Sequence, residues 1–282
     1  MIAAENITSG ARQGKGKGWG VVVTGKGGVG KTTVAAILAH CAATEGDRVL
    51  AIDATRGGGL AASLGIPLEW IKTQDLPVSD SRDQSPFSSA KDHTGPEVPA
   101  VEDVIPRSGI RVTDRLNLLL LKYEKGAAVN HLSLESKSPR NSLRSIEETG
   151  VSVFVLDTDP DIELEVDATA PLFQHVLIVS EPTFNSLRIA EKITRDMFGK
   201  GILYLYLVMN KMRSEEDAQR MKRFLGGLTC YERIFSLPYD EEVLRADPDV
   251  SILLKNSTPF AEGVTRIYRA IRDTESNRGE NT

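Results

Sequence analysis

The chain has 282 residues, with 34 lysine and arginine residues against 39 aspartate and glutamate residues, for a formal net charge of −5. Hydrophobic residues make up 40% of the chain and charged residues 26%, which is typical of a globular protein with a sizeable core. This composition argues against a general nucleic-acid binder, a disulfide framework (the cysteines are Cys41 and Cys230 alone) and a membrane-spanning protein, so we expect a cytoplasmic protein.

Along the chain, short apolar runs alternate with amphipathic segments between an expected flexible leader (1–18) and a polar tail (274–282). Most apolar runs are continuous, as in strands buried on both faces of a parallel sheet. The predicted strands are Trp19–Thr24, Arg48–Asp53, Leu116–Leu121, Val151–Leu156, His175–Ser180, Ile202–Met209 and Arg233–Leu237. The predicted helices are Lys31–Thr44, Pro139–Glu148, Thr183–Phe198, Ser214–Leu225 and Pro259–Asp273. The pattern predicts one α/β domain over 19–273, a doubly wound, mostly parallel sheet flanked by helices.

Residues 72–110 interrupt this alternation with a segment rich in Pro, Ser and Asp. A long surface excursion is the simpler interpretation. A mobile element that docks a partner is the alternative, because long loops in compact domains are often functional.

The strongest motif is GKGGVGKTT at 25–33, which follows the apolar run WGVVVT and opens the helical segment TTVAAILAHCAA. This strand–loop–helix context is that of a phosphate-binding loop, or P-loop. Glycines let backbone N–H groups approach phosphate oxygens, Lys31 supplies an ammonium to the β- and γ-phosphates, and the Thr32 hydroxyl is placed to ligate Mg²⁺. The residues expected to contact nucleotide here are Gly25, Gly27, Gly28, Val29, Gly30, Lys31, Thr32 and Thr33.

The loop also carries a second lysine, Lys26. The run KGGVGKTT resembles the deviant Walker A loop of the P-loop NTPase class that includes the Min and plasmid-partition ATPases and the nitrogenase iron protein. The resemblance covers roughly 19–273 and is closest to CooC-type accessory ATPases, which assist nickel insertion into carbon monoxide dehydrogenase. The similar segments are VTGKGGVGKTT, RVLAID, LAASLGIP, VFVLDT, VMNKM and SLPYDEEVLRAD. The resemblance implies that Lys26 reaches across an ATP-dependent homodimer; a solvated lysine beside the site is the alternative.

The same resemblance implies roles for four residues beyond the loop. It implies that Asp53 and Asp157 hold Mg²⁺ together with Thr32, that Asn210 reads adenine and that Pro238 closes over the base. The expected cofactors are ATP or ADP with Mg²⁺, and the catalytic residues would be Lys26, Lys31, Asp53 and Asp157.

Two positions depart from the family pattern. Where relatives carry a second Asp that orients the attacking water, this chain has Thr55, which cannot accept a proton near pH 7. Where relatives carry a glycine against the γ-phosphate, it has Asp161, whose charge would repel that phosphate unless the side chain points away or a cation intervenes. We therefore expect slow hydrolysis.

Acidic residues also alternate through 157–167. If this segment were extended, they would line one face. An exposed acidic edge is the simpler interpretation, and a site for a hard cation or a basic partner is the alternative.

The nickel-insertion relatives carry Cys-x-Cys before the strand that ends at Asp157, and this chain has no cysteine there. His131 alone is a poor substitute, and Cys41, inside the first helix, is interpreted as a small buried apolar residue. No thiolate-bound metal is expected.

The phosphate-binding loop predicts an Mg-ATP-binding protein, and the resemblance implies a dimeric switch ATPase that serves as an accessory factor for a nickel or iron metalloenzyme. A nucleotide-binding regulatory or scaffold protein that does not hydrolyse ATP is the alternative. A positioning ATPase has less support, because the last predicted helix runs into an acidic, polar tail instead of a basic amphipathic anchor. We expect neither nucleic acid nor a membrane anchor among its partners.

Overall fold

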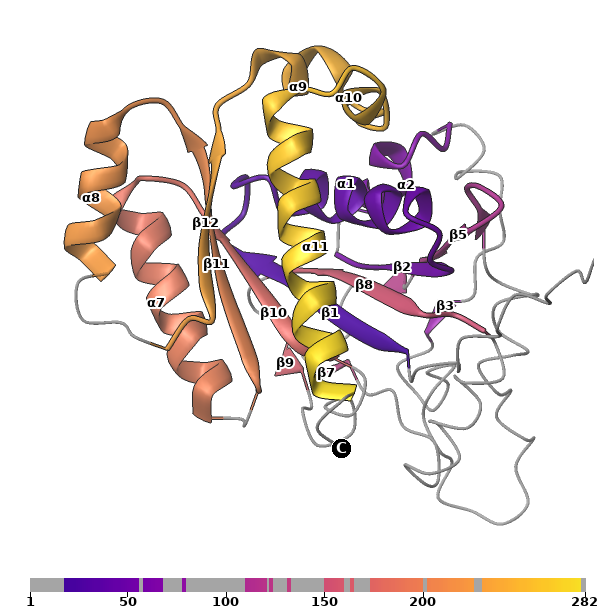
Figure 1. Ribbon diagram of the computed structural model, residues 1–282, viewed down its shortest axis with the longest axis horizontal. Coiled ribbons are helices and arrows are strands. Elements are labelled where there is room, and N and C mark those ends of the chain that lie inside the picture. Colours follow the sequence, from indigo (N-terminus) through magenta and orange to yellow (C-terminus); the bar gives the residue numbers. More distant parts are fainter. Residues whose placement is uncertain are drawn as a thin grey trace, which may run out of the picture.

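An eight-stranded sheet organises the computed structural model, which describes residues 18–55, 58–67, 78–79, 110–120, 122–123, 131–132, 150–159, 163–164, 173–199, 202–225 and 230–279 (Figure 1). Its strands are β1 (Trp19–Gly25), β2 (Val49–Ala54), β4 (Ile110–Arg111), β5 (Leu116–Leu120), β8 (Val153–Thr158), β10 (Phe173–Ser180), β11 (Tyr204–Met212) and β12 (Arg233–Pro238). The order is β12–β11–β10–β1–β8–β2–β5–β4, and only the β4–β5 pair is antiparallel. Two small parallel sheets pair β3 (Val78–Ser79) with β6 (Lys122–Tyr123), and β7 (His131–Leu132) with β9 (Glu163–Leu164).

Different helices cover the two faces of the large sheet. The described helices are α1 (Lys31–Thr44), α2 (Gly59–Ser63), α7 (Phe184–Gly199), α8 (Glu215–Leu225), α9 (Glu241–Ala246), α10 (Ile252–Lys255) and α11 (Pro259–Gly279). Side chains of α1, α2, α10 and α11 pack into one core, and those of α7 and α8 into the other. None of the helices in the described part of the chain is long and apolar enough to cross a membrane.

The central strands show why their sequences are continuously apolar. Successive side chains of a strand point to opposite faces, so Val21 and Val23 enter the core under α1 while Val22 enters the core under α7. Because both faces are covered, all three valines are fully buried. The alternation of strand and helix thus gives the doubly wound sheet that the sequence predicts.

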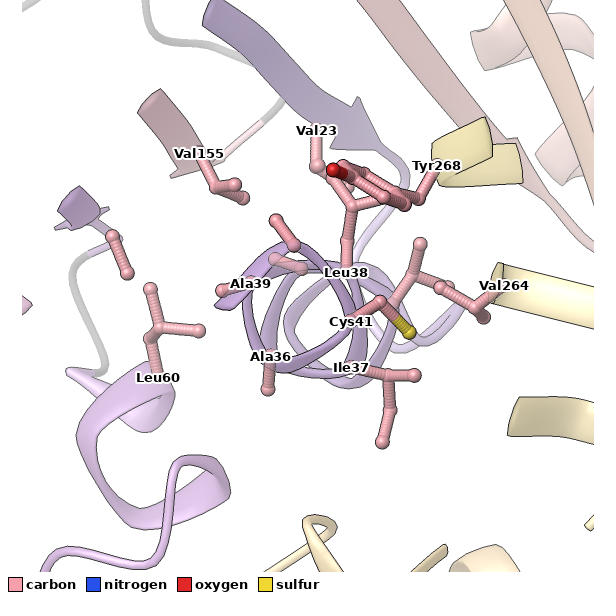
Figure 2. Close-up of a cluster of buried hydrophobic side chains, with 14 of the residues drawn as sticks. Val23, Ala36, Ile37, Leu38, Ala39, Cys41, Leu60, Val155, Val264 and Tyr268 are labelled. Atoms are coloured by element: carbon pink, nitrogen blue, oxygen red, sulfur yellow. The ribbon is translucent and has the colours of Figure 1, made fainter. Parts of the chain in front are cut away.

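Helix α1 is apolar around most of its circumference because it is enclosed by other elements. Figure 2 shows Leu38 beside Val23 of β1 and Tyr268 of α11, with Ile37 on another side of the helix. Its apolar residues contact the sheet, α2 and α11. A helix that is hydrophobic all round is typical of a buried position. The helix that follows the glycine-rich loop is therefore part of the core.

The structure adds details that the apolar pattern does not show. Helix α11 continues to Gly279, beyond the predicted end at Asp273 and into the polar tail. Strand β4 adds a short antiparallel edge beside β5. The predicted helix Pro139–Glu148, the leader up to residue 17 and most of 72–110 lie outside the described residues.

The parallel strands bring distant parts of the chain to one edge of the sheet. Strand β1 lies between β8 and β10, so the loop after β1 lies between the carboxyl ends of two strands that are distant in sequence. Ligands of open α/β sheets bind outside the carboxyl ends of strands, where the chain connections diverge. The residues at or just beyond these ends are Gly25, Asp53, Asp157, Glu181, Asn210 and Pro238.

Candidate nucleotide-binding site

The loop between β1 and α1 requires glycine at two close approaches. Gly25 has a φ of 143°, and a Cβ atom there would lie 2.2 Å from the carbonyl oxygen of Val179 in β10. Gly30 has a φ of 98°, and a Cβ atom there would lie 2.5 Å from Nδ2 of Asn210. Side chains at these positions would therefore force the loop away from β10 and β11. The predicted strand–loop–helix is formed.

The start of α1 has the features of an anion-binding helix terminus. Lys31 is its first residue and is only 6% exposed; its Nζ donates to the carbonyl oxygen of Lys26 at 3.3 Å. No side chain caps the helix, and its first turn contains no acidic residue. The terminal N–H groups and the lysine ammonium thus favour a negatively charged ligand. Thr32 and Thr33, in this first turn, are half-buried.

Asp157 is a buried carboxylate at the end of β8. It is 0% exposed, and within the described residues neither of its side-chain oxygens has a hydrogen-bond partner. The pKa of Asp157 is raised to about 7, chiefly by burial and also by the neighbouring charge of Asp53, whereas the nearby Thr32 hydroxyl and the Lys31 ammonium act to lower it. A group this costly to bury indicates a site that a ligand completes.

Asp53 lies beside Asp157 but has partners of its own. The two residues are paired in the register of β2 and β8. Asp53 Oδ1 accepts from the backbone N–H of Thr55 at 2.9 Å and from its hydroxyl at 2.7 Å, and Oδ2 accepts from the N–H of Leu60 at 2.9 Å. Burial raises the pKa of Asp53, while these hydrogen bonds lower it. Asp53 thus links Thr55, just after β2, to Leu60 of α2, and the Thr55 hydroxyl is directed to Asp53.

Asn210 and Lys211 attach the end of β11 to the glycine-rich loop. Asn210 Nδ2 donates to the carbonyl oxygen of Val29 at 2.8 Å, and its Oδ1 accepts from the N–H of Lys211 at 2.8 Å. Lys211, with a φ of 59°, donates from Nζ to the carbonyl oxygen of Gly28 at 2.7 Å. Both polar ends of the Asn210 side chain therefore support the loop, and its reading of adenine stays a prediction.

Pro238 ends β12 beside this attachment. The N–H of the next residue, Tyr239, donates to the carbonyl oxygen of Met212 at 2.8 Å. The guanidinium carbon of Arg213 lies 4.0 Å from the centre of the Tyr239 ring, in a cation–π contact. The turns after β11 and β12 are thereby joined next to the loop.

Lys26 has an acidic neighbour that the motif does not include. Its Nζ lies 4.0 Å from Oε1 of Glu181, the residue after β10, and Glu181 Oε2 lies 3.3 Å from Nζ of Lys211. The motif search missed Glu181, Lys211 and the Arg213–Tyr239 pair. Their position at or just beyond the carboxyl ends of β10, β11 and β12, on one side of β1, is the signal that could have found them.

The structure corrects one expectation for the acidic segment. Asp157 is fully buried because it lies near the end of β8, a strand covered on both faces. The expectation of an exposed row of acidic residues is therefore wrong for Asp157, its first member. Asp159 is half-buried, while Asp161 and the acids at 165 and 167 lie outside the described residues. Cys41 is buried as expected, and its Sγ lies 3.2 Å from Oγ1 of Thr265.

Comparisons with known proteins agree with this geometry. A family model described as the CobQ/CobB/MinD/ParA nucleotide binding domain matches residues 21–76. The carbon monoxide dehydrogenase accessory protein CooC of Rhodospirillum rubrum is 30% identical over 242 residues, which cover 80% of this chain and 86% of CooC. An uncharacterised ATP-binding protein of Methanocaldococcus jannaschii is 29% identical over 232 residues, which cover 80% of this chain and 88% of that protein.

A solved structure shows the same fold. The septum site-determining protein MinD of Pyrococcus horikoshii, complexed with Mg-ADP, has a TM-score of 0.57 at 16% sequence identity. The similarity covers 90% of this chain and 95% of MinD. From the sequence similarity to CooC, the matching family model and the strand–loop–helix site, this chain belongs to the CobQ/CobB/MinD/ParA family of nucleotide-binding P-loop proteins.

Proposed function

We propose that this chain binds Mg-ATP and works as a nucleotide-dependent dimeric switch, an accessory ATPase for a metalloenzyme. The observation that carries the nucleotide assignment is the buried, unpartnered carboxylate of Asp157 next to a helix terminus that begins with Lys31. An unpaired buried charge costs several kcal/mol, so such a group is retained where a ligand uses it. Hydrated Mg²⁺ fits this donor set, since it offers positive charge and water hydrogens to a carboxylate.

Different residues of the site would contact different parts of the bound nucleotide. Lys31 would exchange the carbonyl oxygen of Lys26 for phosphate oxygens, and the N–H groups of the loop would surround the phosphates. Thr32, with Asp53 and Asp157 beside it, would hold the metal. Mg²⁺ bound with ATP supplies charge neutralisation at the β- and γ-phosphates. Asn210 and Lys211 would keep the loop carbonyls turned away from that charge.

Slow hydrolysis is part of this proposal. Thr55 stands where a water-orienting carboxylate is expected, and its hydroxyl already donates to Asp53. A hydroxyl cannot act as a general base near pH 7, and general-base assistance contributes roughly 10²–10⁴ in rate. Asp161, if close to the γ-phosphate, would further oppose the developing negative charge.

The proposed client is a nickel or iron metalloenzyme. The support is the 30% identity to CooC, a carbon monoxide dehydrogenase accessory protein. Within the described residues, Cys41 is an unsuitable metal ligand, because burial raises the pKa of its thiol to about 11. We therefore propose that this chain acts through its nucleotide state and does not carry the metal on thiolates.

A regulatory or scaffold protein that binds nucleotide without hydrolysing it is the second candidate. The observation that favours it is that the hydroxyl and the backbone N–H of Thr55 both hydrogen-bond to Asp53, so Thr55 supplies no base for hydrolysis. Measured turnover beside measured affinity separates the two, because the scaffold binds ATP with no turnover above background.

Calorimetry with Mg-ADP and Mg-ATP tests the nucleotide assignment. Lys31→Ala should weaken both affinities by roughly 10–150-fold, since a charge-assisted contact contributes ~1.5–3 kcal/mol. Lys222→Ala, on the exposed side of α8, is the control and should bind like wild type. Unchanged affinity in a folded Lys31→Ala protein would disprove the assignment.

A further inference from the structure

The carboxylate of Glu181 lies between two lysines that reach the glycine-rich loop. One of its oxygens is 4.0 Å from Lys26 Nζ and the other is 3.3 Å from Lys211 Nζ. Lys211 also donates to the carbonyl oxygen of Gly28, 2.7 Å away. Glu181 is thus connected to the loop twice, directly through Lys26 and indirectly through Lys211.

Hydrogen bonds fix the backbone around Glu181, and this restricts the position of its carboxylate. The N–H of Glu181 donates to Ser186 Oγ at 3.2 Å, and Ser186 Oγ also accepts from Ser180 Oγ at 3.1 Å. Both serines are buried. The carbonyl oxygen of Pro182 accepts from Arg220 of α8 at 3.0 Å. The turn from β10 to α7 is therefore anchored on both sides of Glu181.

The charges of this cluster have a consequence for nucleotide binding. Lys26 and Lys211 carry two positive charges, and Glu181 neutralises part of them while the phosphate site holds no anion. A triphosphate brought to the loop would repel Glu181 and attract the same lysines. Glu181 and nucleotide therefore compete for Lys26.

We propose that Glu181 is a positioning residue that holds Lys26 within its own subunit until nucleotide phosphates compete for it. This inference rests on the proposed function, in which Lys26 reaches a second subunit when ATP is bound. Lys26 can extend across an interface only after leaving Glu181, so the ion pair raises the ATP concentration at which dimers form. Lys211 keeps Glu181 attached to the loop when Lys26 leaves.

The first experiment measures Lys26 itself, without nucleotide and without assuming a dimer. The intact protein is treated briefly with an amine-acetylating reagent, and the rate at Lys26 relative to Lys222 is read by peptide mass spectrometry. Glu181→Gln should raise the relative rate at Lys26 by about 1.4- to 5-fold, the change that corresponds to an exposed ion pair of ~0.2–1 kcal/mol. Glu191→Gln is the matched control, because Glu191 is 22% exposed against 20% for Glu181 and pairs with Arg195 instead.

The second experiment measures dimerisation by light scattering during a Mg-ATP titration. Glu181→Gln should reach its half-maximal dimer signal at a lower ATP concentration than wild type and Glu191→Gln, by a similar factor. Lys26→Ala should stay monomeric.

The outcomes separate this inference from the proposed function. An unchanged Lys26 rate in a folded Glu181→Gln protein would overturn the restraint. A raised rate with no dimer in any variant supports the restraint and overturns the dimeric switch. If Glu181→Gln raises the acetylation rate at Lys26 but dimerises at the same ATP concentration as wild type, Glu181 does not control dimerisation.

Discussion

Asp157 combines full burial with a carboxylate that has no hydrogen-bond partner in the described part of the chain. Such a group destabilises the nucleotide-free protein, because its charged form loses hydration without gaining donors. Asp157→Asn should raise the free energy of unfolding of the nucleotide-free protein by roughly 1–4 kcal/mol, and Tm by ~2–4 °C for each kcal/mol. The same substitution should weaken binding of Mg-ATP.

The pH dependence provides the check. The folded-state pKa of Asp157 is raised from 3.8 to about 7, so the folded chain holds this proton more tightly than the unfolded chain. Wild-type stability should therefore fall relative to Asp157→Asn as pH rises from about 4 to 7, and the Tm difference should be small near pH 4. Calorimetric scans with EDTA measure this. Equal Tm values for wild type and Asp157→Asn from about pH 4 to about pH 7 would contradict a destabilising effect of the buried Asp157 carboxylate.

Thr55 offers a second test at the residue scale. Thr55→Asp supplies a carboxylate that can orient water, so kcat for ATP should rise, by up to ~10²–10⁴ if a missing base limits hydrolysis. It should also lower stability, because the new carboxylate replaces a hydroxyl that donates to Asp53 at 2.7 Å. Thr55→Asn is the matched control, because asparagine has a shape similar to that of aspartate but no group that can act as a base. Equal turnover in the two variants would show that hydrolysis is limited elsewhere.

Helix α11 contacts the rest of the domain near both of its ends, by apolar packing near its start and by a polar contact near its end. Near its start, Phe260 and Val264 pack in the core beside α1. Near its end, Glu275 Oε1 lies 2.8 Å from Nε2 of the fully buried His175 in β10. The other ring nitrogen of His175 lies 3.2 Å from the Tyr206 hydroxyl. The polar pair thus attaches the end of α11 to the sheet.

Glu275→Ala should therefore destabilise the fold. It leaves one nitrogen of a buried imidazole without its partner, at a cost of about 1–3 kcal/mol. Urea unfolding should show a lower midpoint with a similar m value. Glu262→Ala, at an exposed position of the same helix, is the control and should stay within about 0.5 kcal/mol of wild type. Equal effects of the two substitutions would show that the His175 contact contributes nothing.

For the whole molecule, the apolar pattern predicted the sheet because most strands are buried on both faces. It placed α1 at Lys31–Thr44, as observed, since the glycine-rich loop marks its start. It could not predict strand order, and therefore not that Asp53 pairs with Asp157 across two strands distant in sequence. Glu181 was missed for the same reason: its contacts with Lys26 and Lys211 join residues that only the fold brings together.

The position of α1 has a consequence for how long the protein survives in a cell. Its first residue belongs to the glycine-rich loop and its remaining turns fill the core between the sheet and α11 (Figure 2). A ligand that binds only the folded loop therefore stabilises the entire domain, by about 2.7 kcal/mol at a concentration of 100 Kd. Degradation draws on the small unfolded fraction, so its rate falls as the site fills. With ATP as that ligand, the energy supply of the cell would set the abundance of the protein as well as its activity.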